Sequence, residues 1–190
     1  MNKIFALLSV LLAITINPAF SQDTLVDRDT TTTLPEIPYE GFRNMAFSLK
    51  YGDLQLDPSP ERNIVYGVII DWHLEENIAT IVALLTGDAS IYIKSGQVYM
   101  GGFSHEEISE PARKLVIASQ VLMDKADIYA DNSFPEKHSV KFYLLSNRGT
   151  FMHQEKEEAL NDPGNDWAYI FKLCNDIITA YFKLSDEEKK

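Results

Sequence analysis

Cysteine is nearly absent from this chain of 190 residues, which contains only Cys174. A single cysteine cannot form an intramolecular disulfide, so the fold must depend on the burial of apolar side chains. Cys174 stands within an apolar pattern of helical spacing, where a free thiol usually behaves as a small core residue. We therefore interpret it as a buried structural residue.

Basic residues are also few, since 17 lysines and arginines stand against 28 aspartates and glutamates, and the net charge is -11 at pH 7. This balance argues against a nucleic acid or an anionic membrane surface as the partner. The acidic residues are spread along the chain, which is typical of a solvated surface. The remaining partner classes are a protein and a small ligand.

The apolar run at the N-terminus covers residues 4–16 and falls short of the ~18 residues that indicate a membrane span. Lys3 precedes the run, and Ala19-Phe20-Ser21 supplies the small residues of a cleavage site. This layout predicts a signal peptide over residues 1–21 that is cleaved near Ser21 and Gln22. We expect an exported protein, periplasmic or secreted, with no membrane span in the mature chain.

The rest of the chain predicts one domain between two polar ends. Residues 22–38 contain a threonine run, several aspartates and two prolines, which predicts a flexible tether. Residues 39–185 carry the apolar periodicity of a single domain, and residues 186–190 form a charged C-terminal end.

Hydrophobic periodicity predicts the order helix, four strands, helix, two strands, helix. Ser104 and Glu107 have the spacing of a capping box, although Pro111 favours a regular helix that begins only near Ser109. The elements are expected at residues 42–49, 63–72, 78–85, 89–94, 97–100, 104–126, 139–145, 150–154 and 167–181.

This order predicts an α+β fold with an antiparallel sheet of about six strands and helices packed on one face. The order is similar to that of profilin-like and secretion-chaperone-like domains. That likeness concerns topology and implies no function.

Catalytic and cofactor motifs are missing from the sequence. No two of the four histidines stand at metal-ligand spacing, and neither a G-x-S-x-G elbow nor a phosphate-binding glycine loop occurs. We therefore expect no cofactor and no metal site. A calcium-dependent module remains an alternative because of the acidic balance and the loop at residues 162–166, although an EF-hand pattern is absent.

A hydrolase or transferase is the other alternative. Asp71 and His73 share one face of a predicted strand, Asp88 lies in the turn before another strand, and Ser90 lies at the start of that strand. If the fold gathers these four side chains, they could supply an acid, a base and a nucleophile. The sequence alone does not place them together, and turn chemistry explains Asp88 equally well.

A non-enzymatic module that binds a protein or a ligand is the preferred hypothesis. The helix around residues 115–123 has more apolar residues than a single stripe requires, and a second copy of the chain could cover the excess. A homodimer is therefore possible. The side chains expected to face a partner or ligand are Trp72, Tyr92, Ile117 and Val121.

Several segments resemble an uncharacterised family of exported bacterial proteins. They are G-V-I-I-D-W at residues 67–72, A-T-I-V-A-L-L-T-G-D-A-S-I-Y at 79–92, Gly101-Gly102, and V-K-F-Y-L-L at 140–145. The resemblance covers residues 40–182 and implies a shared fold, with no activity attached to it.

Overall fold

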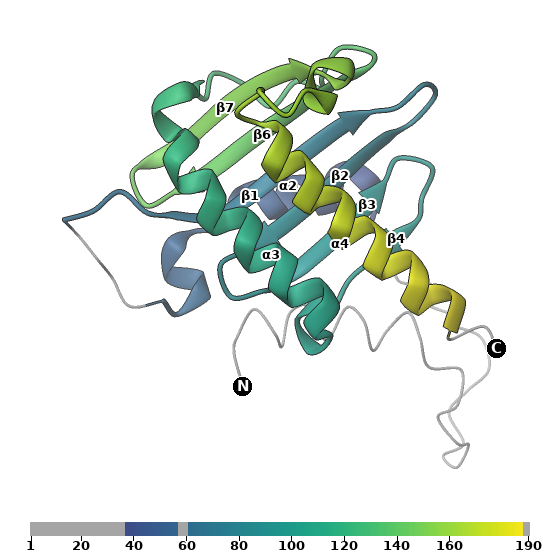
Figure 1. Ribbon diagram of the computed structural model, residues 1–190. Helices are drawn as coiled ribbons and strands as arrows, with labels where there is room; N and C mark the ends of the chain where they lie inside the picture. The colour runs from purple at the N-terminus through teal and green to yellow at the C-terminus, as the bar shows by residue number, and fades with distance from the viewer. Residues whose placement is uncertain (1–36, 57–60, 188–190) are drawn as a thin grey trace, which may run out of the picture.

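A seven-stranded antiparallel sheet forms the centre of the protein in the computed structural model, which describes residues 37–56 and 61–187 (Figure 1). Its strand order is β4-β3-β2-β1-β6-β7-β5. The predicted signal peptide, nearly all of the predicted tether and the last three residues lie outside the described part. The strands are β1 Val65–His73, β2 Ile78–Leu84, β3 Ala89–Ile93, β4 Val98–Tyr99, β5 Asp127–Ile128, β6 Ser139–Ser146 and β7 Gly149–Lys156.

Within the described residues, three α-helices accompany the sheet: α2 Tyr39–Ser48, α3 Glu106–Ser119 and α4 Ala168–Glu187. They confirm the predicted α+β class. Short 3-10 helices lie between the main elements, namely η1 Tyr51–Leu54, η2 Gly102–Ser104, η3 Gln120–Lys125 and η4 Glu157–Asn161.

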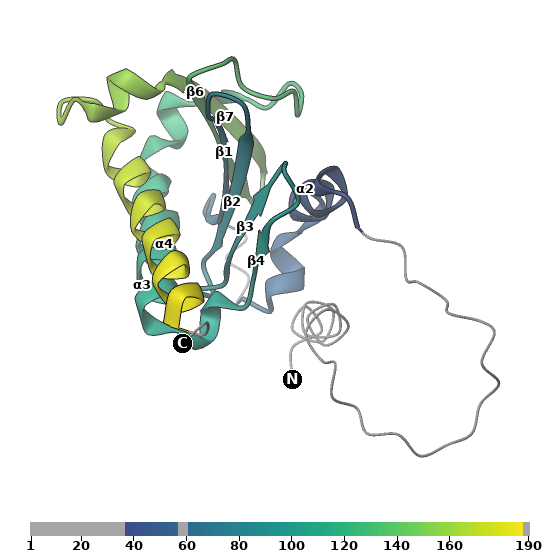
Figure 2. The same cartoon turned by 90° about the vertical axis from the view of Figure 1, so that its right-hand side faces the viewer.

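The two faces of the sheet are covered by different helices. Helices α3 and α4 lie side by side on one face, and α2 lies on the other (Figure 2). Alternation along β1 sends Val68 and Ile70 toward α3 and α4, whereas Ile69 and Asp71 point toward α2. The expectation that all helices pack on one face is therefore wrong for α2. The continuous apolar runs of β1 and β2 require cover on both faces, and α2 supplies it on the second.

The larger core lies between the sheet and the α3–α4 layer. Phe142 and Leu144 of β6 belong to the same buried cluster as the apolar stripes of both helices, and Cys174 of α4 is fully buried in it. Burial raises the pKa of the Cys174 thiol far above its usual value because the thiolate would lose its hydration. This position accords with the structural role inferred from the sequence.

The start of α3 differs from the predicted capping box. The helix begins at Glu106 with His105 as its N-cap, and the Ser104 hydroxyl donates to the Gly101 carbonyl, 3.1 Å away. Pro111 lies inside α3 instead of in its first turn. Proline has no N–H, so the carbonyl four residues earlier loses its usual helical donor. Burial of the α3 stripe compensates for this loss.

The close approach of η2 to α4 requires glycine at position 102. A Cβ on Gly102 would overlap the side chains of Ile108 and Tyr181, and the Tyr181 hydroxyl is held 2.6 Å from the Ala89 carbonyl. We expect Gly102→Ala to lower the free energy of unfolding by about 1–3 kcal/mol, the usual cost of overpacking. Urea denaturation measures the loss. Gly52→Ala is the control, because no atom lies within 4 Å of a Cβ there; equal stability losses in the two variants would contradict the account.

Candidate functional sites

A buried ion pair joins α2 to the sheet. Arg43 of α2 donates from Nε and Nη2 to Asp71 Oδ2 of β1, at 2.9 and 2.6 Å. Thr80 of β2, the cross-strand neighbour of Asp71, donates its hydroxyl to Oδ1 at 2.6 Å. Arg43 is 3% exposed and Asp71 is 0% exposed. Both charges are therefore withdrawn from water and satisfied by each other and by neighbouring groups.

Aromatic rings and one carbonyl complete the surroundings of Arg43. The guanidinium carbon lies 4.8 Å from the ring centroids of both Phe47 and Phe134. Nη2 also donates to the Asn132 carbonyl at 2.8 Å and lies 3.4 Å from the Tyr143 hydroxyl. A guanidinium ion held by a carboxylate and by aromatic faces is stabilised by charge and by cation–π attraction together.

The tyrosines of this cluster remain protonated. Burial raises the pKa of Tyr39 and of Tyr143 far above 10, and the nearby charge of Asp71 adds to the rise. Burial by itself would lower the pKa of Arg43, but the hydrogen bonds and charge of Asp71 raise it above its usual value. The cluster therefore holds a buried ion pair among neutral hydroxyls.

The structure does not bring His73, Asp88 and Ser90 to Asp71 as one catalytic group. His73 Nδ1 lies 2.9 Å from the Pro135 carbonyl at the end of β1, whereas Asp88 lies in the β2–β3 turn at the opposite end of the sheet. In the register of the sheet, Ser90 of β3 pairs with Val82 of β2, and Val82 pairs with Ile69 of β1. Ile69 lies four residues before His73, so Ser90 and His73 are offset by roughly 13 Å along the strand direction.

Asp88 and Ser90 each have a local partner. The Thr86 hydroxyl donates to Asp88 Oδ2 at 2.7 Å within the turn, and the Ser90 hydroxyl donates to the Tyr92 oxygen at 2.7 Å. These bonds account for both residues through turn geometry and packing. Asp71 and His73 do share a face of β1, as strand alternation predicts.

Trp72 and Tyr92 are placed differently from the expectation that they face a partner. Tyr92 is buried under α2, where its ring stacks on Phe42 at a centroid distance of 5.1 Å. Trp72 is partly buried beside Phe171 of α4, and its indole N–H donates to Glu157 at 3.1 Å. Tyr92 therefore belongs to the core beneath α2, whereas Trp72 is only partly covered.

Ile117 and Val121 face solvent on the outside of the helical layer. Ile117 is 61% exposed and Val121 is 75% exposed, and they follow Glu110 and Lys114 on one face of α3 and its 3-10 extension η3. Tyr169 at the start of α4 is 56% exposed. We call Ile117, Val121 and Tyr169 the helix-layer patch.

Helices α3 and α4 pack against each other, and Tyr169 lies within electrostatic reach of Lys114 on α3. The pKa of Lys114 is raised chiefly by its hydrogen bond to Glu110 and the charge of that carboxylate, with smaller contributions from Tyr169 and Asp176 of α4. Lys125 at the end of η3 forms an ion pair of 2.5 Å with Asp166, which lies just before the start of α4. The patch therefore spans both helices.

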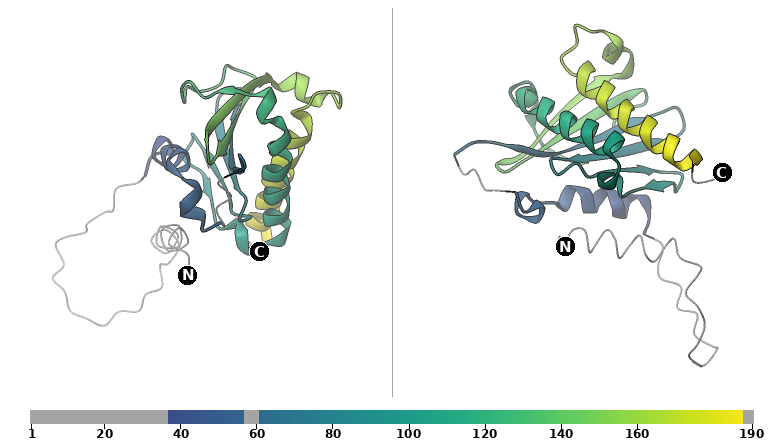
Figure 3. Two further views of the ribbon diagram at one scale, coloured as in Figure 1. Left: turned by 90° about the vertical axis from the view of Figure 1, so that its left-hand side faces the viewer. Right: turned by 60° about the horizontal axis from the view of Figure 1, so that its bottom comes forward.

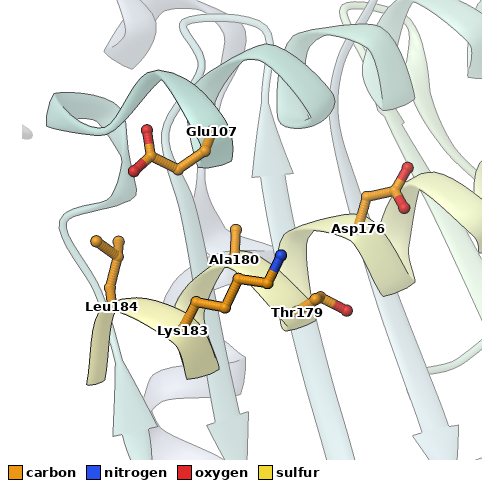
Figure 4. A pocket seen from close by; sticks show the side chains of 6 residues that line it. All are labelled: Glu107, Asp176, Thr179, Ala180, Lys183 and Leu184. Carbon is orange, nitrogen blue, oxygen red and sulfur yellow. The ribbon is translucent and has the colours of Figure 1, made fainter. Parts of the chain in front are cut away.

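A hollow of about 400 Å³ lies toward the other end of the same surface (Figure 4). Glu107 of α3 lines one side, and α4 supplies the other lining residues. Their chemistry is mixed, with carboxylates and a lysine around two apolar side chains and a threonine. The α4 residues are Asp176, Thr179, Ala180, Lys183 and Leu184.

Two further properties hold for residues 37–56 and 61–187. No group of three or more histidine, cysteine, aspartate or glutamate side chains is arranged to hold a metal ion there. No helix in the same ranges is long and apolar enough to cross a membrane.

Arg43 and Tyr169 are the site residues that sequence reasoning missed. A signal for Arg43 exists, because it stands between Tyr39 and Ala46 at i, i+4 and i+7 on the buried face of α2. An arginine within an apolar stripe indicates a buried anionic partner. Tyr169 has no comparable signal in the sequence, since tyrosine occurs on both the buried and the exposed face of amphipathic helices.

Compared with family models, with curated proteins and with solved structures, the chain shows no match. The resemblance of its strand segments to an exported bacterial family therefore stays a prediction.

Proposed function

We propose that this protein is an exported, non-enzymatic binding module that docks a second copy of itself through the helix-layer patch. The observation that carries the proposal is the exposure of Ile117 of α3 and Val121 of η3, together with that of Tyr169 at the start of α4. Large exposed apolar side chains that share one face of a helix are typical of interaction surfaces. Export rests on the signal-like residues 1–21.

The rim of the patch favours a second copy despite the acidity of the chain. Three lysines of the α3–η3 and α4 segments each pair with a carboxylate, so these groups add no net charge that would repel an identical surface. These pairs are Lys114 with Glu110, Lys125 with Asp166, and Lys172 with Asp176.

A two-fold contact also fits the shape of this layer. Helices α3 and α4 run antiparallel across the same face, so their outer residues form a continuous surface (Figure 1). Rotation by a two-fold axis brings the apolar end of α3 against its counterpart, as self-complementary interfaces require. Tyr169 then supplies a large ring with few rotatable bonds at the edge of the contact.

We expect the chain that begins at Gln22 to be a dimer in light scattering at tens of micromolar concentration. Ile117→Asp combined with Val121→Asp should convert it to a monomer, because two buried carboxylates on each copy cannot be compensated. Since both positions are exposed in the single chain, urea denaturation of the double variant should show little change in monomer stability.

The matched control is Ile128→Asp, because Ile128 is an even more exposed isoleucine that lies on the edge strand β5 and not on the helices of the patch. This variant should remain dimeric. A monomeric parent chain would overturn self-association through the patch, and so would a dimer that the Ile117 and Val121 substitutions leave intact.

A further inference from the structure

The turn that leads from β7 into α4 is built around Trp167. The segment after β7 crosses from the sheet to the helical layer, where α4 begins at Ala168 (Figure 3). Trp167 is 3% exposed, and its ring centroid lies 5.1 Å from that of Phe142 on β6. Its backbone N–H donates to Asn165 Oδ1 at 2.8 Å. The indole and the amide of Trp167 are therefore both held where the chain enters α4.

The ring of His153 on β7 stacks on this indole. The two ring centroids are 4.3 Å apart, and the ring planes are inclined by only 10°. The His153 side chain is 24% exposed, so protons reach the ring, whereas its Nε2 atom is buried. Among the described residues, Nε2 has no hydrogen-bond partner. Such an orphaned nitrogen requires an explanation, since nearly all buried polar atoms of proteins are paired.

A carboxylate faces the orphaned nitrogen. Glu155 Oε2 lies 3.6 Å from His153 Nε2, just beyond the range of a hydrogen bond. The same oxygen accepts from Asn165 Nδ2 at 3.2 Å, and Oε1 accepts from the Lys156 amide at 3.0 Å. Burial by itself would raise the pKa of Glu155, but these hydrogen bonds and His153 lower it overall. Glu155 is therefore ionised at neutral pH and presents a negative charge to the imidazole.

The other charged groups of the elements around His153 leave Glu155 as its partner. Helix η4 packs on β7 and adds only carboxylates, whose negative charge also favours a protonated ring. Opposite His153, β6 places the uncharged Phe142, and Asp127 of β5 pairs with Met152 on the other face of β7. The lysines of β7, η3 and the first turns of α4 each pair with a carboxylate of their own. The η4 carboxylates are Glu157 and Glu158, and the lysine pairs are Lys156 with Glu136, Lys125 with Asp166 and Lys172 with Asp176.

We infer that His153 and Glu155 form a proton-operated latch on the turn into α4. A proton taken up from solvent by the imidazole converts the unbonded contact between Nε2 and Oε2 into a charge-assisted hydrogen bond. The imidazolium also gains cation–π attraction from the Trp167 ring on which it stacks. Because Oε2 also holds Asn165, and Asn165 holds the Trp167 amide, acid fixes the start of α4 more firmly. This inference does not depend on the proposed dimer.

The fluorescence of Trp72→Phe, in which Trp167 is the remaining tryptophan, reports the proton on His153. An imidazolium ion in contact with an indole quenches its emission much more strongly than neutral imidazole does. We expect the emission to fall about twofold as the pH is lowered from about 8 to about 5, the range in which histidine titrates. His153→Gln should abolish this change. The matched control is His105→Gln at the N-cap of α3, which should retain it.

Hydrogen exchange of the Trp167 amide in the otherwise unmodified chain tests the latch itself. After correction for the intrinsic pH dependence of exchange, the protection of this amide should rise severalfold over the same acidification, because its acceptor Asn165 is held more firmly. Glu155→Gln should lose most of this rise yet keep the fluorescence change, since the stacked rings do not need the carboxylate.

The inference would be overturned by emission from Trp167 that does not respond to pH, or by a response that survives His153→Gln. A Trp167 amide whose protection is the same at both pH values, or rises equally in Glu155→Gln, would overturn it as well.

Discussion

Arg43→Ala is expected to lower the free energy of unfolding by about 3 kcal/mol, measured by urea denaturation, because it leaves the fully buried Asp71 carboxylate without its cation. The loss should lie at the lower end of the range for broken buried pairs, since Lys141, the direct cross-strand neighbour of Asp71 on β6, leaves a positive charge on the same face of the sheet. Adding Lys141→Met removes this substitute and should carry the loss toward about 5 kcal/mol.

Replacing both members of the ion pair with apolar residues tests whether the pair itself contributes to stability. Arg43→Met combined with Asp71→Leu removes both charges together, so its stability should lie within about 1–2 kcal/mol of the parent chain or above it. A loss of less than about 1 kcal/mol for Arg43→Ala, the value of an exposed ion pair, would contradict our description of this cluster.

Phe142→Ala is expected to lower the free energy of unfolding by about 3–5 kcal/mol, because it leaves a cavity at the centre of the larger core. Phe142 is fully buried, and its ring centroid lies 5.1 Å from that of Trp167. Urea denaturation and the labelling rate of Cys174 report the same global unfolding, so both should change together.

Phe182→Ala is the matched control for this cavity. Phe182 lies on α4 with its ring half exposed, in edge contact with Tyr99. Its truncation should cost less than about 1 kcal/mol, since water already reaches the ring. Equal losses for the two phenylalanines would contradict the assignment of the central core to the α3–α4 side of the sheet.

The secondary structure was largely predictable because the apolar patterns are strong. The runs of β1 and β2, the β6–β7 hairpin and the stripe of α4 occur near their expected positions. Strand β5 was missed, since its two residues form no period and Ile128 is exposed. A strand of two residues forms because the edge of β7 is available for pairing, so its own sequence shows no hydrophobic pattern.

The sites were less predictable than the elements. Strand alternation placed Asp71 and His73 on one face, but the partner of Asp71 stands 28 residues earlier on a helix whose docking site the sequence does not specify. The expectation for Tyr92 failed because exposure depends on whether α2 covers its face of β3. Ile117 and Val121 were identified because α3 has more apolar residues than its buried stripe uses.

Photo-cross-linking from position 117 tests the central claim most directly. A benzophenone side chain in place of Ile117 should give covalent dimers of the purified chain, with the cross-links on α3 and the first turns of α4 of the second copy. The same group at Ile128 should give few. A chain that stays uncross-linked from position 117, or that cross-links equally from both positions, would contradict self-docking through the helix-layer patch.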